Sequence, residues 1–487
     1  MSVTSPSSPP QVTAARDVTA AGIDASCRLP LVVMFLAAGV WLLLASVFGL
    51  IASIKFHAPA FLADAAWLTY GRVHPVSTNA LLYGFAVQAG LGVTLWVLAR
   101  LGRVMLAAPW MVLVGALLWN LGVALGVTAI LDGSSTGFEH LEFPSYAAAL
   151  MFLGFVVVAF WALVTLHRRS QRELYVSQWF LLAALFWFPW IYSTANLLLG
   201  VFPVRGIAQA VIAWWFSQNL LIVWFGLVGL ATLFYVVPRF TGRDLHSRYL
   251  ALLSFWMLIL FGSWAGVPGN APVPAWMPSV SVVASVLGIV TVLSVFLNLW
   301  RTLDGKCLMF MSDPSLKFMG FGLVSFVVGG LAGAVVAFPA FNQVTQFTWF
   351  AVARALLQSY GFLAMMLFAA IYAIVPRMLG RELPYPKLVT AHFFLAAAGV
   401  LLLVLPLAAG GIAQGLKLQQ SNVAFLDIAK ATLPFLRAST TGDLLLALGH
   451  LLFLLNLGVL VLGYYRAQAM VAWVEANTEL KTAEARG

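Results

Sequence analysis

The feature that most constrains this chain is a succession of twelve long apolar runs within 487 residues. A helix needs about 20 apolar residues to cross a hydrocarbon core about 30 Å thick. The runs are continuous rather than alternating, which favours helices over a barrel because a helix satisfies its own backbone hydrogen bonds in lipid. They lie near 30–54, 76–99, 104–131, 144–167, 176–200, 207–237, 248–267, 277–300, 317–338, 349–375, 389–409 and 442–465.

Composition supports the same fold class, because 62% hydrophobic and 9% charged residues exclude a soluble globule. The sequence therefore predicts an all-α, polytopic membrane protein with one twelve-span domain over 30–466. Residues 1–29 are expected to form a disordered cytoplasmic tail, and 467–487 a cytoplasmic C-terminal tail. The longest loop, near 410–441, is expected to cap the outer face, and the interior is expected to be packed and dry with Trp and Phe side chains.

Basic residues indicate the orientation of the bundle. With the N-terminus inside, 19 of the 26 Lys and Arg residues fall in inner loops or tails, six fall outside, and Arg354 lies within a span. Both termini are therefore predicted to be cytoplasmic, in a bacterial inner membrane. The formal charge of +10 is attributed to contact with anionic lipid headgroups and not to nucleic acid. Cys27 and Cys307 lie far apart without a metal-binding pattern.

Local strings resemble one family along 70–381. YGRVHPVSTNALLYGF (70–85), LEFP (141–144), LYVSQWF (174–180), WWFSQN (214–219) and YVVPRFTGR (235–243) are followed by FW (255–256), WAG (264–266), SDPSLKF (312–318) and YAIVPRMLGR (372–381). In this order they resemble heme-copper oxidase subunit I, most closely the catalytic subunit of cbb3-type cytochrome c oxidases. The resemblance implies a twelve-helix bundle whose family activity is oxygen reduction.

The same resemblance implies six histidine ligands for heme iron and copper and one redox tyrosine, and this sequence has none of them. The low-spin heme ligand of the second span falls on Ser77, and the copper ligands fall on Gln218, Pro268 and Gly269. The tyrosine position falls on Gly262. The tenth-span pair that ligates both hemes falls on Arg354 and Leu356. Iron and copper take imidazole nitrogen at these positions, so no catalytic residue and no cofactor is predicted.

Seven histidines remain elsewhere, and two are weighed as substitutes. His74 lies three residues before Ser77, displaced by about 4.5 Å along a helix and about 60° around it, so it is the best candidate ligand for a retained heme b. An interfacial role ahead of Pro75 is the simpler interpretation. His450 is expected to be a buried histidine hydrogen-bonded to a neighbouring carbonyl.

Arg354 is the unusual residue, because an arginine within a span costs at least about 2.5 kcal/mol to insert. All 16 carboxylates are expected in loops or tails, so Arg354 is expected to extend toward the outer headgroups or to donate to carbonyls and Gln218. Binding of an anion, a lipid headgroup or a heme propionate is the alternative. Glu139 and Glu142 lie in a loop that could hold a structural cation, with Glu142 the better candidate, although exposed acids are usually just solvated.

Three functions remain open. The first is a non-catalytic scaffold of a respiratory or electron-transfer complex, with a membrane-anchored c-type cytochrome or another respiratory subunit as the partner that the resemblance implies. The second is an active oxidase or nitric oxide reductase-like enzyme with unorthodox heme ligands. The third is a solute transporter or channel built on the same bundle, although no paired carboxylates or inverted repeat support it.

Overall fold

The structure is a computed structural model that describes residues 19–311 and 313–484, and within these ranges its regular secondary structure is helical throughout. Several spans combine an α-helix with a stretch of wider π-helix. In chain order the elements are α1 (Ala20–His57), η1 (Ala66–Leu68), α2 (Tyr70–Asn79), η2 (Ala80–Val87), α3 (Gln88–Gly102), α4 (Pro109–Asp132), α5 (Ser145–His167), α6 (Val176–Asn196), η3 (Leu197–Val201), α7 (Ile207–Gln218), η4 (Asn219–Trp224), α8 (Phe225–Thr241), α9 (Arg248–Gly262), α10 (Trp276–Leu287), α11 (Ile289–Thr302), η5 (Cys307–Met311), α12 (Pro314–Ala337), α13 (Pro339–Thr345), α14 (Trp349–Leu356), η6 (Leu357–Ala364), α15 (Met365–Leu379), α16 (Pro386–Leu418) and α17 (Phe425–Glu484).

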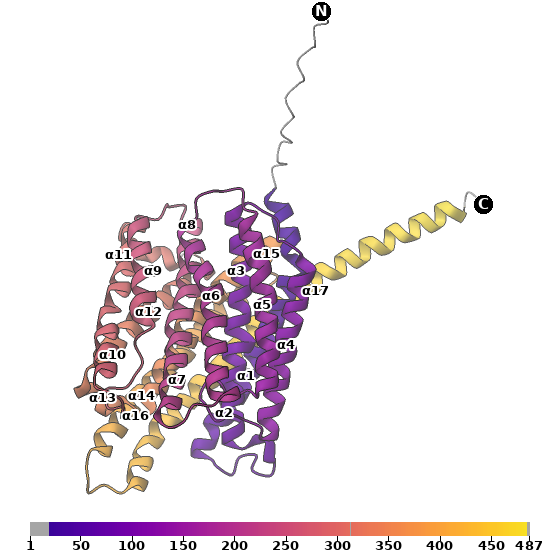
Figure 1. The fold of residues 1–487 in the computed structure, drawn as a ribbon. Coiled ribbons are helices and arrows are strands. Elements are labelled where there is room, and N and C mark those ends of the chain that lie inside the picture. The colour runs from indigo at the N-terminus through magenta and orange to yellow at the C-terminus, as the bar shows by residue number, and fades with distance from the viewer. Residues whose placement is uncertain (1–18, 312, 485–487) are drawn as a thin grey trace, which may run out of the picture.

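Eleven continuous helical segments in the described residues are long and apolar enough to cross a membrane, and α9 is a shorter apolar helix that fills the place of the seventh expected span. They stand side by side as one bundle (Figure 1). The predicted all-α membrane bundle is therefore confirmed.

Three segments form the centre of the bundle. The most apolar stretch of α2–α3 is 100% buried, that of α7–α8 is 94% buried and that of α14–α15 is 89% buried. In each of the other spans, no more than 50% of the corresponding stretch is buried. The central segments carry Ser77, Gln218, Arg354 and Leu356, so four of the six positions that bear ligands in the resembled family lie on the innermost helices.

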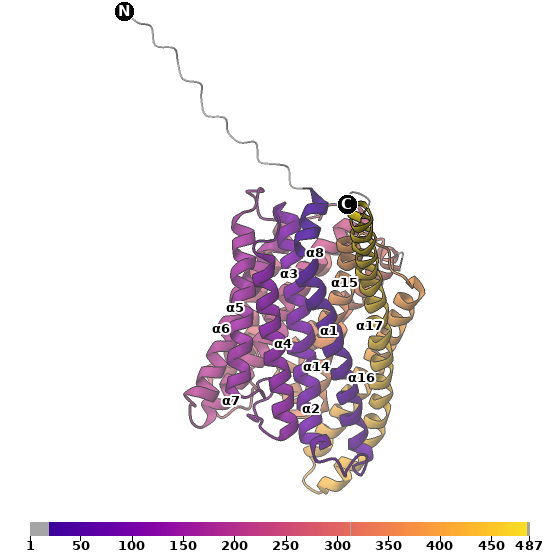
Figure 2. The ribbon, with the colours of Figure 1, turned by 90° about the vertical axis from the view of Figure 1, so that its right-hand side faces the viewer.

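Helix ends differ from the prediction in several places. Of the expected disordered tail over 1–29, residues 1–18 lie outside the described part of the chain. From Ala20 onward the expectation is wrong, because α1 begins there with Thr19 as its N-cap. The expected outer loop over 410–441 is also wrong, since α16 and α17 extend well past the apolar runs and only 419–424 separates them. Residues 467–484 continue α17, which leaves the bundle at the same end as the start of α1 (Figures 1 and 2).

Several carboxylates lie within helices rather than in loops, and two of them correct the sequence interpretation because they are also at least partly buried. Asp24 in α1 is 8% exposed, accepts a hydrogen bond from the Trp96 indole at 3.0 Å and lies 3.4 Å from Arg100 Nη1. Asp443 lies within α17 and is partly buried. Neither is among the residues that surround Arg354.

Candidate functional site

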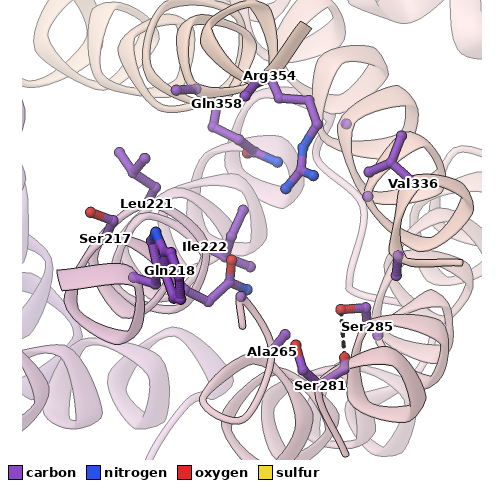
Figure 3. Close-up of a pocket in the computed structure, with 18 of the residues that line it drawn as sticks. Ser217, Gln218, Leu221, Ile222, Ala265, Ser281, Ser285, Val336, Arg354 and Gln358 are labelled. Atoms are coloured by element: carbon purple, nitrogen blue, oxygen red, sulfur yellow. Dashed lines mark hydrogen bonds between the residues drawn. The ribbon is translucent and has the colours of Figure 1, made fainter. Parts of the chain in front are cut away.

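The bundle contains a cavity of about 640 Å³. Its walls come from α7 and η4, from α9 and the loop that follows it, from α10 to α12, and from α14 and η6. Gln218 enters from one side, and Arg354 and Gln358 enter from the other (Figure 3). The expected packed interior is therefore wrong for this part of the molecule.

Five of the seven replaced family positions line this cavity, namely Gln218, Gly262, Pro268, Gly269 and Arg354. They come from three separate stretches of chain, so their convergence was not imposed by sequence proximity. Ser77 and Leu356 are not part of the lining.

Ser77 instead joins two helices, because its hydroxyl donates to the Ala45 carbonyl of α1 at 2.8 Å. Leu356 packs against the hydrophobic core. Ser77 and Leu356 thus serve helix packing in this chain.

The Gln218 side chain is held against the end of α9. Its Nε2 donates to the Gly262 carbonyl at 3.4 Å, and Gly266 lies against its aliphatic carbons. A Cβ atom at position 266 would lie 2.6 Å from Gln218 Cβ, and Gly266 has a φ of +102°. Only glycine fits this position, so the loop after α9 closes tightly over Gln218.

The donor set does not fit the metals of the resembled family. Pro268 and Gly269 have no side-chain donor atom, and the Gln218 amide nitrogen is already a hydrogen-bond donor. The Arg354 guanidinium is always protonated and has no acceptor lone pair, and Leu356 is a hydrocarbon. None of these groups can replace the neutral imidazole nitrogen that copper and heme iron take.

Arg354 faces the cavity without a counter-ion. No carboxylate lies within 4.0 Å of it, since the ion pairs of the described chain are Asp24–Arg100, Glu139–His140 and Glu173–Arg248. Its guanidinium points into the cavity (Figure 3), and none of the hydrogen bonds found in the described residues involves it. The expectation that Arg354 donates to carbonyls and Gln218 is therefore wrong, whereas its extension toward the outer headgroups stays a prediction.

The helix that carries Arg354, α14, and the short helix α13 before it are both held in close contact with α16. A Cβ atom on Gly415 would lie 1.8 Å from the Val344 carbonyl oxygen, and one on Gly411 would lie 2.1 Å from the Phe350 nitrogen. Gln414, on the same stretch of α16, accepts a hydrogen bond from the Trp349 backbone at 3.1 Å. Backbone-to-backbone packing of this kind is possible only with glycine, and it sets where the guanidinium enters the cavity.

Glu142 lies at the edge of this region in a buried polar group, which corrects the expectation of a solvated loop. It is 7% exposed and accepts a hydrogen bond from Asn79 Nδ2 at 2.8 Å, while Asn79 Oδ1 has no partner. Burial raises the pKa of the Glu142 carboxyl, although nearby His140 and the Asn79 hydrogen bond act to lower it. No group of three or more His, Cys, Asp or Glu residues suited to a metal occurs in the described part of the chain.

His140, in the loop between α4 and α5, is a cavity residue that the sequence interpretation did not single out. It is 6% exposed, it lines the cavity, and its Nδ1 lies 2.8 Å from the Ser217 hydroxyl. The Tyr83 hydroxyl donates to its backbone carbonyl. A sequence signal existed, because Ser217 adjoins Gln218, but the distance of 77 residues between the partners concealed it.

His74 does not contribute to the cavity, and its interfacial role stays a prediction. It is exposed near the start of α2, its ring stacks on Tyr70 at 5.2 Å, and it does not line the cavity. His450 is buried as expected, but its Nδ1 meets the Ser46 hydroxyl at 2.6 Å instead of a carbonyl.

Stretches of π-helix follow three of the replaced positions. η4 begins directly after Gln218, η6 begins directly after Leu356, and η2 begins three residues after Ser77. Such wide turns are rare and frequently mark functional sites. The backbone thus keeps local irregularities beside positions whose side chains no longer suit a metal.

Comparisons with known proteins agree with this architecture. Residues 30–445 match the model of a family described as cytochrome c and quinol oxidase polypeptide I. The chain is 26% identical over 441 residues to the cbb3-type cytochrome c oxidase subunit CcoN1 of Stutzerimonas stutzeri, covering 87% of this chain and 91% of that protein. It is 26% identical over 440 residues to a bacteroid cytochrome c oxidase subunit 1 homolog of Bradyrhizobium diazoefficiens, covering 85% and 78%. A heme-copper terminal oxidase dimer solved by cryo-electron microscopy superposes with a TM-score of 0.69 at 15% identity, covering 88% of this chain and 84% of that one.

Proposed function

Because the chain belongs to the cytochrome c and quinol oxidase polypeptide I family, we propose that it is a non-catalytic, cbb3-type-like subunit of a membrane respiratory complex that binds neither heme nor copper. The observation that carries the proposal is the chemistry of the cavity wall. Gln218, Pro268, Gly269 and Arg354 converge there, and together they offer no imidazole. The redox groups of the complex would then reside in partner subunits.

The proposed partner is a membrane-anchored c-type cytochrome or another respiratory subunit. Support comes from the relatives, which are named as oxidase subunits. A tagged chain purified in mild detergent should co-purify with a protein that stains for covalent heme.

We also propose that both termini are cytoplasmic in a bacterial inner membrane. The start of α1 and the exit of α17 lie at one end of the bundle (Figure 1), and most basic residues in loops are assigned to that side. Alkaline phosphatase fused after residue 487 should be inactive, whereas the same fusion placed after Gln420 should be active.

One observation favours a second candidate, an oxidase-like enzyme with unorthodox ligation. His140 lies at the cavity wall as a buried imidazole. Its Nδ1 is engaged by Ser217, and its Nε2 lies 3.9 Å from Glu139. A single histidine at this place could hold at most one metal centre, and the tenth-span positions supply no second ligand.

A pyridine hemochrome spectrum with elemental analysis of the purified chain tests the proposal. We expect heme and copper well below one per chain, unchanged in H140A. One or two hemes per chain would overturn the proposal, and loss of such heme in H140A would support the second candidate. The catalytic subunit of a cbb3-type oxidase, expressed and purified in parallel, serves as the positive control.

A further inference from the structure

Arg354 and its cavity form a site that the proposed scaffold role does not use. An ionised group held within a membrane protein normally pairs with another group or lies beside a functional path. Arg354 has no such protein partner in the described residues, and its guanidinium points into the cavity. An anion inside the cavity is the partner that would compensate the charge.

The charges around the cavity also favour an anion. Glu139 is the sole carboxylate in the cavity lining, but its side chain is 78% exposed and faces His140. Arg354 is the one lysine or arginine among the same residues. The inner part of the cavity thus has a positive charge without an opposing one.

Neutral donors lie beside the guanidinium. Gln358 lies one turn from Arg354, and its amide points the same way (Figure 3). It makes no hydrogen bond within the described protein, and Gly329 of α12 leaves it room, since a Cβ atom there would lie 2.9 Å from Gln358 Nε2. An arginine fork next to a free amide suits the two oxygens of a carboxylate.

The rest of the cavity selects for an apolar body. Much of its wall is hydrocarbon, provided by Leu221, Ile222, Met257, Val292, Phe326 and Phe362. A volume of about 640 Å³ falls within the range typical of sites for organic ligands. An inorganic anion would fill only a small part of it and leave the apolar wall without a partner.

We infer that the cavity binds an organic acid with an apolar body, its carboxylate on Arg354 and Gln358 and its hydrocarbon part along the apolar wall. This inference rests on the proposed function, because a heme in the same space would exclude the acid. The acid could be a fatty acid from the membrane or a smaller acid from solution, since both have the same chemistry.

Titration calorimetry of the whole chain in lipid nanodiscs tests the inference, with empty nanodiscs subtracted. The probes are octanoate, hexadecanoate, 1-octanol and inorganic phosphate. We expect octanoate to bind at least about tenfold more tightly than 1-octanol and phosphate not to bind. Hexadecanoate binding more tightly than octanoate points to a membrane source, and the reverse order points to a soluble acid.

R354M should weaken octanoate binding at least about tenfold while the protein remains folded, because it removes a charge that has no protein partner. Q358L should weaken binding less. The matched control is R205M, in the exposed loop before α7, which should leave binding unchanged. Octanoate binding that is no tighter than that of octanol, or unaffected by R354M, overturns the inference.

The hemochrome measurement keeps the two failures apart. A heme-free chain that ignores octanoate refutes the acid site and leaves the proposed function standing. A chain that contains heme refutes the proposed function and the acid site together.

Discussion

The region around Gln218 and Arg354 keeps a cavity of about 640 Å³, whereas the region beside Ser77 is filled by side chains. An aromatic cluster occupies that second region, formed by Phe318, Tyr360, Phe368, Tyr372, His392, His450 and Phe453. Phe368 lies 4.6 Å from His392 and 5.1 Å from Phe453 between ring centroids, and Tyr360 stacks on His450 at 5.7 Å. Ser46, which contacts His450, adjoins the Ala45 carbonyl that accepts from Ser77.

The difference shows that losing metal ligands does not by itself decide whether the space is filled. Large rings close the second region, and Phe453 and His450 are fully buried there. The wall of the first region includes glycines at 262, 266, 269, 329, 330 and 333 and an arginine without an ion-pair partner. Small residues leave volume, and a charge keeps apolar groups from packing against it.

The largest expected effect is a loss of stability in the first region, around Gln218 and Arg354. G415V would force a side chain into the Val344 carbonyl, 1.8 Å from the new Cβ atom, and push α13, the short helix before α14, away from α16. We expect a loss of at least about 3 kcal/mol in unfolding free energy, measured by denaturing-detergent titration with tryptophan fluorescence.

G458V is the control, because a Cβ atom at 458 in α17 meets nothing within 4 Å. It should change the unfolding free energy by no more than about 0.5 kcal/mol. Equal losses in the two variants would show that valine in a helix of this bundle is harmful in itself.

A matched pair of phenylalanine truncations sharpens the comparison. F453A removes a ring that is 0% exposed within the aromatic cluster, and F326A removes one that is 7% exposed and borders the cavity. We expect roughly 3–5 kcal/mol for F453A and about half as much for F326A, since a ring beside a void has fewer neighbours to lose. The same detergent titration measures both, and a larger loss in F326A contradicts the description of the cavity.

The smallest effect concerns pH at the polar edge of the cavity. Burial raises the pKa of the Glu142 carboxyl above that of an exposed glutamate, so the native state binds its proton more tightly than the unfolded chain does. This contribution to stability is complete below about pH 4.5 and is lost as pH rises through the folded pKa. E142Q should therefore unfold at a higher temperature than the parent chain near neutral pH, with the difference shrinking toward pH 4.

E139Q is the control in that series, since the Glu139 side chain is 78% exposed. Its melting temperature should follow the parent chain at every pH. A parent chain and E142Q that respond identically to pH would refute the role of Glu142 burial.

The membrane bundle could be predicted from the sequence because the hydropathy of each segment indicates directly whether it lies in lipid or in water. The prediction failed at the ends of α16 and α17, where residues such as Gln414, Lys417 and Arg437 continue a helix although they are polar. Hydropathy marks where lipid ends and does not mark where a helix ends.

The positions of the site residues along the chain could be predicted from the sequence, but the contacts around these residues could not. Flanking strings located Gln218, Pro268 and Arg354, and the structure brings them to one cavity. Contacts such as Gly329 with Gln358 and Gly411 with Phe350 determine whether that space is open and whether Arg354 has a partner. These pairs are 29 and 61 residues apart, and no local pattern reports them.

The wide turns after Gln218 and Leu356 have one more consequence. A turn with an extra residue rotates everything beyond it around the helix axis, and this phase belongs to the backbone regardless of which side chains it presents. Histidines introduced at 218 and 356 would each stand directly before one of these wide turns. The bundle is therefore a scaffold on which an artificial metal centre could be designed by changing side chains alone, without changing the helix backbones.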